Sequence, residues 1–155
     1  EAMFPVSGGN IAIMIAAATD NRNRAVSEIK TILKKSGGQM VPNGSVGYMF
    51  ENVGMLDLDK KQTSTLEEIE LAAIDAGAKD IVTNNDTVTV YTEPADLKSV
   101  ESSLTEIGAT IETSVLGYRP VQTISLSEED REKYDALLDQ LDEQEDVQTV
   151  FDNTV

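Results

Sequence analysis

Hydrophobic spacing along the first third of the chain predicts a strand, a helix and a second strand. Isoleucines alternate with small residues from Ile11 to Ala16, which is the period of a strand with one buried face. From Arg22 to Lys35 the apolar residues recur at helical spacing, and Ser36-Gly37-Gly38 is a typical helix end. Alternation returns from Ser45 to Phe50, which we therefore expect to be a strand. The residues expected on one face of that strand are Val46, Tyr48 and Phe50.

The middle of the chain contains the pattern of a complete βαββαβ unit between Gly54 and Gly117. Its first helix is expected to begin at the capping box Ser64-x-x-Glu67, and the turn Asn84-Asn85-Asp86 predicts a hairpin. A second helix is expected between Pro94 and Gly108. The strands of this unit are predicted at Met55 to Asp59, Asp80 to Thr83, Thr87 to Thr92 and Thr110 to Leu116.

The last third of the chain predicts a strand at Val121 to Leu126, a helix capped by Ser127 and a strand at Val147 to Phe151. Neither these elements nor the first three have enough partners to form a sheet alone. Joined together, they make a second βαββαβ unit. We therefore predict an α+β fold of two modules, with residues 54–117 inserted into a discontinuous outer module formed by residues 1–53 and 118–155.

The chain has no His and no Cys, and this absence restricts its chemistry. It removes the usual zinc ligands, the histidine general base, the thiolate nucleophile and any Ser-His-Asp triad. Asp57 and Asp59 share one side of a predicted strand, but two carboxylates without a third ligand rarely hold a metal ion. The sequence therefore favours a protein that is not an enzyme, with no metal, no cofactor and no small-molecule substrate.

Neither a membrane span nor an export signal is apparent in the sequence. No apolar run approaches the roughly 18 residues of a membrane-spanning helix, and the first residues lack the basic and apolar regions of a signal peptide. The lack of cysteine fits a reducing compartment. These observations predict a cytoplasmic protein with no membrane partner.

The net charge of −16 is unevenly distributed along the chain. Residues 1–50 carry five basic and three acidic side chains, whereas residues 51–155 carry seven and twenty-five. We therefore expect an electrostatically two-sided molecule. All five cations of the first segment lie on the predicted helix, away from its apolar face: Arg22, Arg24, Lys30, Lys34 and Lys35. They could neutralise phosphates and give sequence-independent affinity for nucleic acid, or they could form an ordinary solvated helix face.

Two asparagines and two lysines complete the candidate nucleic-acid contacts. Asn21 and Asn23 lie beside the arginines and could contact backbone phosphates or rRNA, although the same segment also suits a helix cap. Asp20 is the residue that we favour as that cap. Lys60 and Lys61 lie in a predicted loop of the inserted module, where lysines are commonly only solvated.

Two further segments have simple explanations. Gly37-Gly38-Gln39 matches the tripeptide of peptide release factors, but the end of the preceding helix already accounts for both glycines. Residues 128–146 hold ten acidic and two basic side chains, which could dock a basic protein partner, mimic nucleic acid or keep the molecule soluble. Solubility is the interpretation that we favour.

Five motifs, in the same order, resemble the YebC/PmpR family over roughly residues 8–153. They are Thr19-Asp20-Asn21-Arg22-Asn23-Arg24, Gly37-Gly38, Gly44-Ser45-Val46-Gly47-Tyr48-Met49-Phe50, Ala76-Gly77-Ala78-Lys79-Asp80 and Asp146-Val147-Gln148-Thr149-Val150-Phe151-Asp152-Asn153. The resemblance implies two nested ferredoxin-like domains that follow an N-terminal helical domain rich in Lys and Arg. We expect that helical domain to be absent from this chain.

The resemblance also implies a regulator of gene expression without catalytic residues. Members of the family are described as transcriptional regulators that bind promoter DNA, and others act in translation, helping ribosomes through stretches such as consecutive prolines. We therefore expect a DNA-binding regulatory protein, with a ribosome-associated translation factor and an acidic protein-interaction module as alternatives. Some members are mitochondrial, so an organellar relative would work in the matrix rather than in the cytoplasm.

Overall fold

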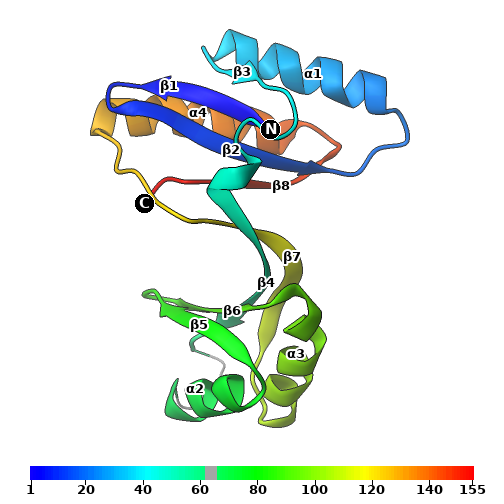
Figure 1. Ribbon diagram of the computed structural model, residues 1–155, viewed down its shortest axis with the longest axis vertical. Coiled ribbons are helices and arrows are strands. Elements are labelled where there is room, and N and C mark those ends of the chain that lie inside the picture. Colours follow the sequence, from blue (N-terminus) through cyan, green and yellow to red (C-terminus); the bar gives the residue numbers. More distant parts are fainter. Residues whose placement is uncertain (62–65) are drawn as a thin grey trace. The chain divides into compact units, whose positions relative to one another are not determined.

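The computed structural model describes residues 1–61 and 66–155 of the chain (Figure 1). Clustering of its contacts divides the chain into two compact units, Glu1–Glu51 with Tyr118–Val155, and Asn52–Gly117. We call these the outer unit and the inserted unit. Within the described residues, each unit contains one four-stranded sheet and two α-helices.

The inserted unit has the element order βαββαβ and the strand order β5-β6-β4-β7. Its elements are β4 (Phe50–Asp59), α2 (Leu66–Asp75), β5 (Ala78–Thr83), β6 (Thr87–Thr92), the 3₁₀ turn η2 (Pro94–Asp96), α3 (Leu97–Glu106) and β7 (Ile111–Pro120). Strand β6 pairs antiparallel with both β4 and β5. The predicted hairpin and both predicted helices are therefore confirmed, whereas the capping residue Ser64 lies outside the described residues.

The core of the inserted unit lies between its sheet and its two helices. Leu56 and Val90 are opposite each other on β4 and β6, and both are completely buried. They belong to one apolar cluster with Ile69 of α2 and with Val100 and Leu104 of α3. The three-residue and four-residue spacing that predicts α3 thus places its apolar side chains in this core.

The outer unit combines segments from both ends of the chain. Its elements are β1 (Ala2–Val6), β2 (Gly9–Ala17), α1 (Arg22–Lys35), β3 (Gln39–Met40), the 3₁₀ turn η1 (Gly47–Met49), α4 (Glu128–Glu143) and β8 (Val147–Asp152). The sheet has the order β3-β1-β2-β8, and its neighbouring strands pair antiparallel. Phe4 and Ile11 of the sheet pack with Leu33 of α1 and Tyr134 of α4, which fixes both helices against the strands. An α+β fold with two ferredoxin-like modules is therefore confirmed.

The predicted strand from Ser45 to Phe50 is wrong. This segment forms a turn followed by η1, and only Phe50 belongs to a strand, as the first residue of β4. Two backbone N–H groups of the segment, those of Val46 and Gly47, donate hydrogen bonds to the carboxylate of Glu1, as does that of the preceding Gly44. Because those groups bond a side chain, they are not available for a strand ladder. Tyr48 is 73% exposed, whereas the predicted strand would have placed it beside buried residues.

The predicted strand from Val121 to Leu126 is also wrong. It makes a single parallel bridge, from Ile124 to Thr154, and is otherwise irregular. The outer sheet is completed instead by β1, a strand that we did not predict, which pairs with both β2 and β3. The outer unit therefore reaches four strands through an N-terminal hairpin rather than through the order predicted from spacing.

Among the described residues, no helix combines the length and the apolar character that crossing a membrane requires.

Candidate nucleic-acid interface

Helix α1 carries most of the candidate contacts, and its two ends are defined locally. Asn21 is the N-cap, because its side-chain oxygen accepts a hydrogen bond of 3.1 Å from the backbone N–H of Arg24. The prediction that Asp20 caps this helix is therefore wrong. At the other end Gly37 has a φ of +90°, and Gly38 donates a backbone hydrogen bond of 2.8 Å to the carbonyl of Leu33. The two glycines thus serve as a helix end, as predicted.

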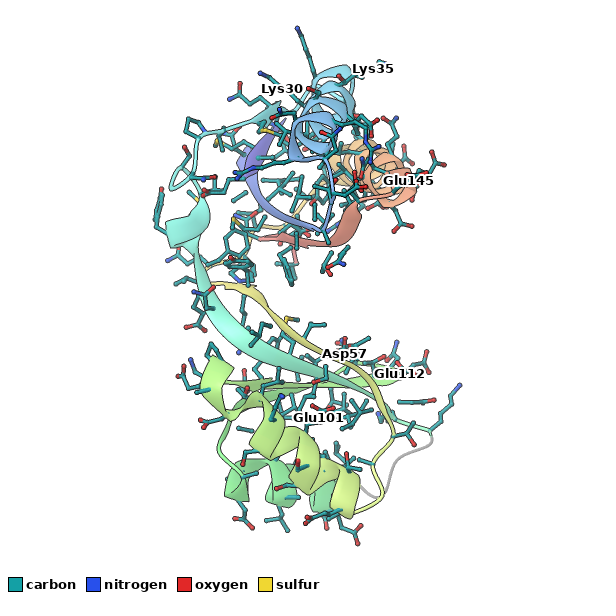
Figure 2. The ribbon with its side chains drawn as sticks, turned by 90° about the vertical axis from the view of Figure 1, so that its right-hand side faces the viewer. Lys30, Lys35, Asp57, Glu101, Glu112 and Glu145 are labelled. Carbon is teal, nitrogen blue, oxygen red and sulfur yellow. The ribbon has the colours of Figure 1, made fainter. Side chains whose placement is uncertain are left out.

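The cations of α1 lie away from the core. Ala25, Ile29 and Leu33 form the buried face of the helix, whereas Lys30 and Lys35 are exposed (Figure 2). Lys34 and Lys35 also lie in the last turn, where a positive charge interacts favourably with the helix dipole. The dipole alone gives both lysines a structural reason to be there, but it does not apply to Lys30, which lies before the last turn.

Arg24 is the exception, because it forms ion pairs within the protein. Its guanidinium lies 3.7 Å from the carboxylate of Asp20 and 3.5 Å from that of Asp146. The Asp146 side chain is only 11% exposed. Of the predicted contacts on α1, Arg24 is thus the one whose charge is already compensated within the described residues, and it joins the start of α1 to the segment before β8.

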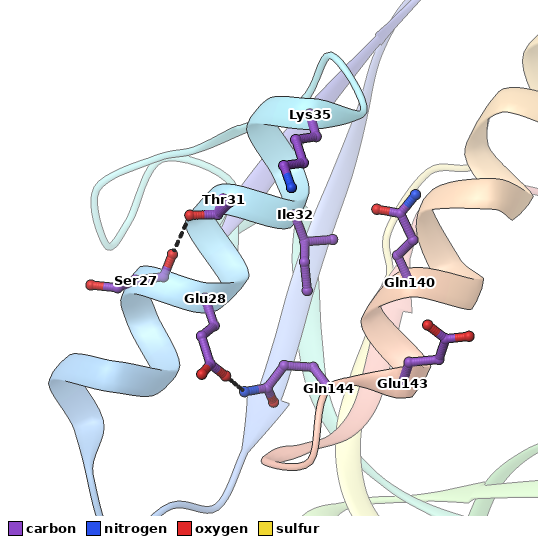
Figure 3. Close-up of a pocket in the computed structure, with 8 residues that line it drawn as sticks. All are labelled: Ser27, Glu28, Thr31, Ile32, Lys35, Gln140, Glu143 and Gln144. Atoms are coloured by element: carbon purple, nitrogen blue, oxygen red, sulfur yellow. Dashed lines mark hydrogen bonds between the residues drawn. The ribbon is translucent and has the colours of Figure 1, made fainter.

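Gln144 extends this connection to the middle of α1. Its amide nitrogen donates a hydrogen bond of 2.7 Å to Glu28 on α1 (Figure 3). Its amide oxygen accepts one of 2.7 Å from the backbone N–H of Asp146. Counted as whole residues, Gln144 and Asp146 are both 8% exposed. Two of the five recognised motifs therefore meet here, since Arg24 belongs to the first and Asp146 to the last.

A groove of about 740 Å³ lies between α1 and α4, beside this network. Ile32 and Lys35 of α1 line one side, and Gln140 and Glu143 of α4 line the other (Figure 3). The basic helix and the acidic helix are therefore neighbours within one unit. The expectation of an electrostatically two-sided molecule, drawn from the two parts of the sequence, does not describe this packing: the outer unit carries eight basic and fifteen acidic side chains.

Arg22, Lys30, Lys34 and Lys35 are exposed and form no ion pair with any described residue. Arg22 also lines a second groove, of about 760 Å³, together with Thr19 and Asn43. Asn23 is exposed on the first turn of the helix. We use the name α1 cationic surface for the four exposed cations of this helix without an ion pair among the described residues: Arg22, Lys30, Lys34 and Lys35.

Lys60 and Lys61 belong to the inserted unit and lie just after β4. The ammonium of Lys61 is 3.6 Å from the carboxylate of Asp86, and both side chains are largely exposed. The nearby Asp57 accepts hydrogen bonds from the hydroxyls of Thr89, at 2.7 Å, and Thr113, at 3.0 Å. Within residues 1–61 and 66–155, no group of three or more acidic side chains could hold a metal ion.

The pattern of hydrophobic and polar residues gives no indication of the role of Glu1. Its carboxylate accepts hydrogen bonds from the backbone N–H groups of Gly44, Val46 and Gly47. Desolvation acts to raise the pKa of Glu1, but the three hydrogen bonds outweigh it, so the pKa lies below its ordinary value. The only signal in the sequence is the turn-forming Pro42-Asn43-Gly44, which does not identify a partner more than forty residues away.

Known proteins similar to this chain identify its family. Residues 1–154 match the family described as "TACO1/YebC second and third domain". A "probable transcriptional regulatory protein" of Kosmotoga olearia is 41% identical over 99% of this chain and 61% of its own length. One of Thermotoga maritima is 37% identical over 94% of this chain and 57% of its own length. The crystal structure of a conserved hypothetical protein from Aquifex aeolicus superposes with a TM-score of 0.90 and 34% identity, covering 99% of this chain and 63% of that one.

Two ferredoxin-like modules, one of which carries exposed cations on α1, define an α+β protein. The chain belongs to the TACO1/YebC family. It spans 57% and 61% of the length of the two curated relatives named above.

Proposed function

We propose that this chain is part of a non-enzymatic, cytoplasmic regulator of gene expression that contacts DNA through the α1 cationic surface. Two observations support the proposal. Relatives at 37–41% identity carry the name "probable transcriptional regulatory protein". The structure adds a surface whose four cations lack internal partners among the described residues.

The proposal rests on one observation: the four cations of the α1 cationic surface form no ion pair with other described residues. A cation that is already paired must lose its partner before it neutralises a phosphate, whereas an unpaired one does not. Each neutralised phosphate on duplex DNA contributes a salt dependence of about −0.9 to the slope of log K against log salt concentration. Contact through three or four of these side chains therefore predicts a slope of about −3 to −4.

The negative charge of the rest of the outer unit should weaken DNA binding and restrict the directions from which DNA can approach α1. The outer unit as a whole is negatively charged, with fifteen acidic and eight basic side chains, and therefore repels a polyanion from most directions. DNA avoids the acidic helix α4 when it approaches α1 from the side away from the groove that Lys35 lines. We therefore expect weak, salt-sensitive binding with little preference for base sequence, because phosphate contacts position a protein but do not read bases.

The test is fluorescence anisotropy with a labelled DNA duplex at several salt concentrations, using the wild type and the variant Lys30→Glu/Lys34→Glu. The expected result is a marked loss of affinity in the variant and a slope reduced by about 2, one for each lost phosphate contact. Lys98→Glu is the matched control, since Lys98 is an exposed lysine on α3 that forms no ion pair with the described residues.

Equal binding by the wild type, Lys30→Glu/Lys34→Glu and Lys98→Glu would refute a role for α1. Ribosome co-sedimentation of the same proteins addresses the alternative function in translation. If Lys30→Glu/Lys34→Glu abolishes co-sedimentation but leaves DNA affinity unchanged, the α1 cationic surface contacts the ribosome rather than DNA.

A further inference from the structure

Strand β8 is an outermost strand of the outer sheet, next to β2 (Figure 1). It pairs with β2 from Ile13 opposite Asp152 to Ala17 opposite Val147. On its other side no strand follows, so one row of its backbone groups faces outward. Such an edge is a template for a further strand, and proteins commonly protect it or use it for binding.

The hydrogen bonds at the end of β8 show which backbone groups face outward. Ile124 donates to the carbonyl of Asn153 at 2.7 Å and accepts from the N–H of Val155 at 2.9 Å. Because outward groups alternate along a strand, those of Phe151 and Thr149 also face away from β2. Neither residue has a backbone or side-chain hydrogen bond on that side within the described chain. The segment around Ile124 thus covers only the last part of the edge.

A groove of about 240 Å³ follows the uncovered part of this edge. Leu138 of α4 and Val150 of β8 give it an apolar floor, and Asp139 and Asp142 of α4 line its side. Both aspartates are exposed and form no ion pair with the described residues. The cations of α4 are used elsewhere, since Arg131 pairs with Asp135 and Lys133 with Glu129.

These charges decide which strand can occupy the edge. A second copy of this chain, pairing β8 with β8, would bring Asp139 and Asp142 of both copies to one seam, where like charges repel. A lysine or arginine on an added strand would instead lay its aliphatic stem over Leu138 and Val150 and place its charge beside the aspartates. The edge therefore suits a basic extended segment and disfavours self-association.

We propose that the edge of β8 from Val147 to Phe151 binds an extended basic segment of a partner protein, which adds to the outer sheet as a fifth strand. The backbone groups of Thr149 and Phe151 supply the ladder hydrogen bonds. Asp139 and Asp142 select lysine or arginine at the alternate positions that face α4. This surface is separate from the α1 cationic surface, and it does not depend on the proposed function.

The test uses an acetylated and amidated heptapeptide in which lysine and valine alternate. Its binding to the full chain is measured by titration, and the contact is located by the NMR shifts of the backbone amides. The expected result is saturable binding, with the largest shifts at the amides of Thr149 and Phe151. A peptide with N-methyl groups on every backbone nitrogen should not bind, because it has no N–H group to donate to the ladder at either edge. Replacement of lysine by glutamate should also abolish binding.

Asp139→Asn/Asp142→Asn tests the selection of charge. We expect its affinity to fall about fivefold, the effect of losing two exposed ion pairs. Glu128→Gln/Glu132→Gln is the matched control, because it removes two exposed carboxylates of α4 outside the groove, and its affinity should fall much less. No binding by the lysine peptide, equal binding by the N-methylated peptide, or equal losses in both variants would each overturn the proposal.

Discussion

Arg24 shows that the role of a charged side chain depends on the groups around it. Like Lys30 it is a cation on α1, yet it is held between Asp20 and Asp146. Asp146 in turn lies in the hydrogen-bond network of Gln144, which reaches Glu28. We therefore assign Arg24 to the stability of the outer unit rather than to its contact with nucleic acid.

Replacement of Arg24 by alanine should lower the free energy of unfolding. About half of its side chain is exposed, so solvent screens the pairs, and we expect a loss of about 1 kcal/mol. Arg22→Ala is the control and should change stability by less than about 0.5 kcal/mol, because Arg22 is exposed and has no ion pair with the described residues. Urea denaturation of both variants is the measurement. Equal losses in the two variants would contradict this assignment.

At the scale of the elements, the local patterns predicted the helices well and two of the strands badly. The residues of α1 are those predicted, from Arg22 to Lys35, because spacing and the glycine stop act within the segment. The segments 45–50 and 121–126 have strand-like composition, but their partners lie far away in the chain. Backbone N–H groups of the first segment bond the Glu1 carboxylate instead of a strand. The second segment makes one isolated bridge, to Thr154, among the residues that the structure describes.

The same limit applies to the candidate site. That α1 is basic and exposed could be predicted, since charge and period are local properties of the sequence. That Arg24 also pairs with Asp146 could not be predicted, because Asp146 is more than one hundred residues away. The free edge of β8 could not be predicted either, because it depends on which strand lies at the end of the sheet.

The loop that Glu1 holds should make stability sensitive to acid. The pKa of the Glu1 carboxyl group is lower in the folded protein than its ordinary value of 4.5. The ionised carboxylate therefore stabilises the fold above pH 4.5, and this stabilisation is lost as the pH falls through the pKa of the folded state. Glu1→Gln, which retains only one acceptor oxygen, should therefore unfold at a lower urea concentration at pH 7.

This difference between the wild type and Glu1→Gln should shrink as the pH falls below the ordinary pKa of the carboxyl group. Urea midpoints of both proteins between neutral and acidic pH measure the effect. A constant difference across that range would show that charge on Glu1 does not matter to the loop.

At the scale of the whole molecule, each unit has its own sheet and its own apolar cluster. The inserted unit, Asn52–Gly117, contains every residue of one cluster, so it should fold when expressed by itself. A core of this size rarely supplies more than about 3–5 kcal/mol, so we expect a low free energy of unfolding. Circular dichroism during urea denaturation of the fragment measures it. A fragment without cooperative unfolding would show that the unit requires its host.

The outer unit is built from the first and last parts of the chain, and this has a consequence for synthesis. As the polypeptide leaves the ribosome, β1, β2 and α1 emerge first. They still lack β8 and α4, and α4 supplies Tyr134, Leu137 and Leu141 to their core. The inserted unit is complete earlier, so it can reach its native state while the N-terminal segment still waits for its partners. During translation, the inserted unit can therefore finish folding before the outer unit does, although the outer unit begins first in the chain.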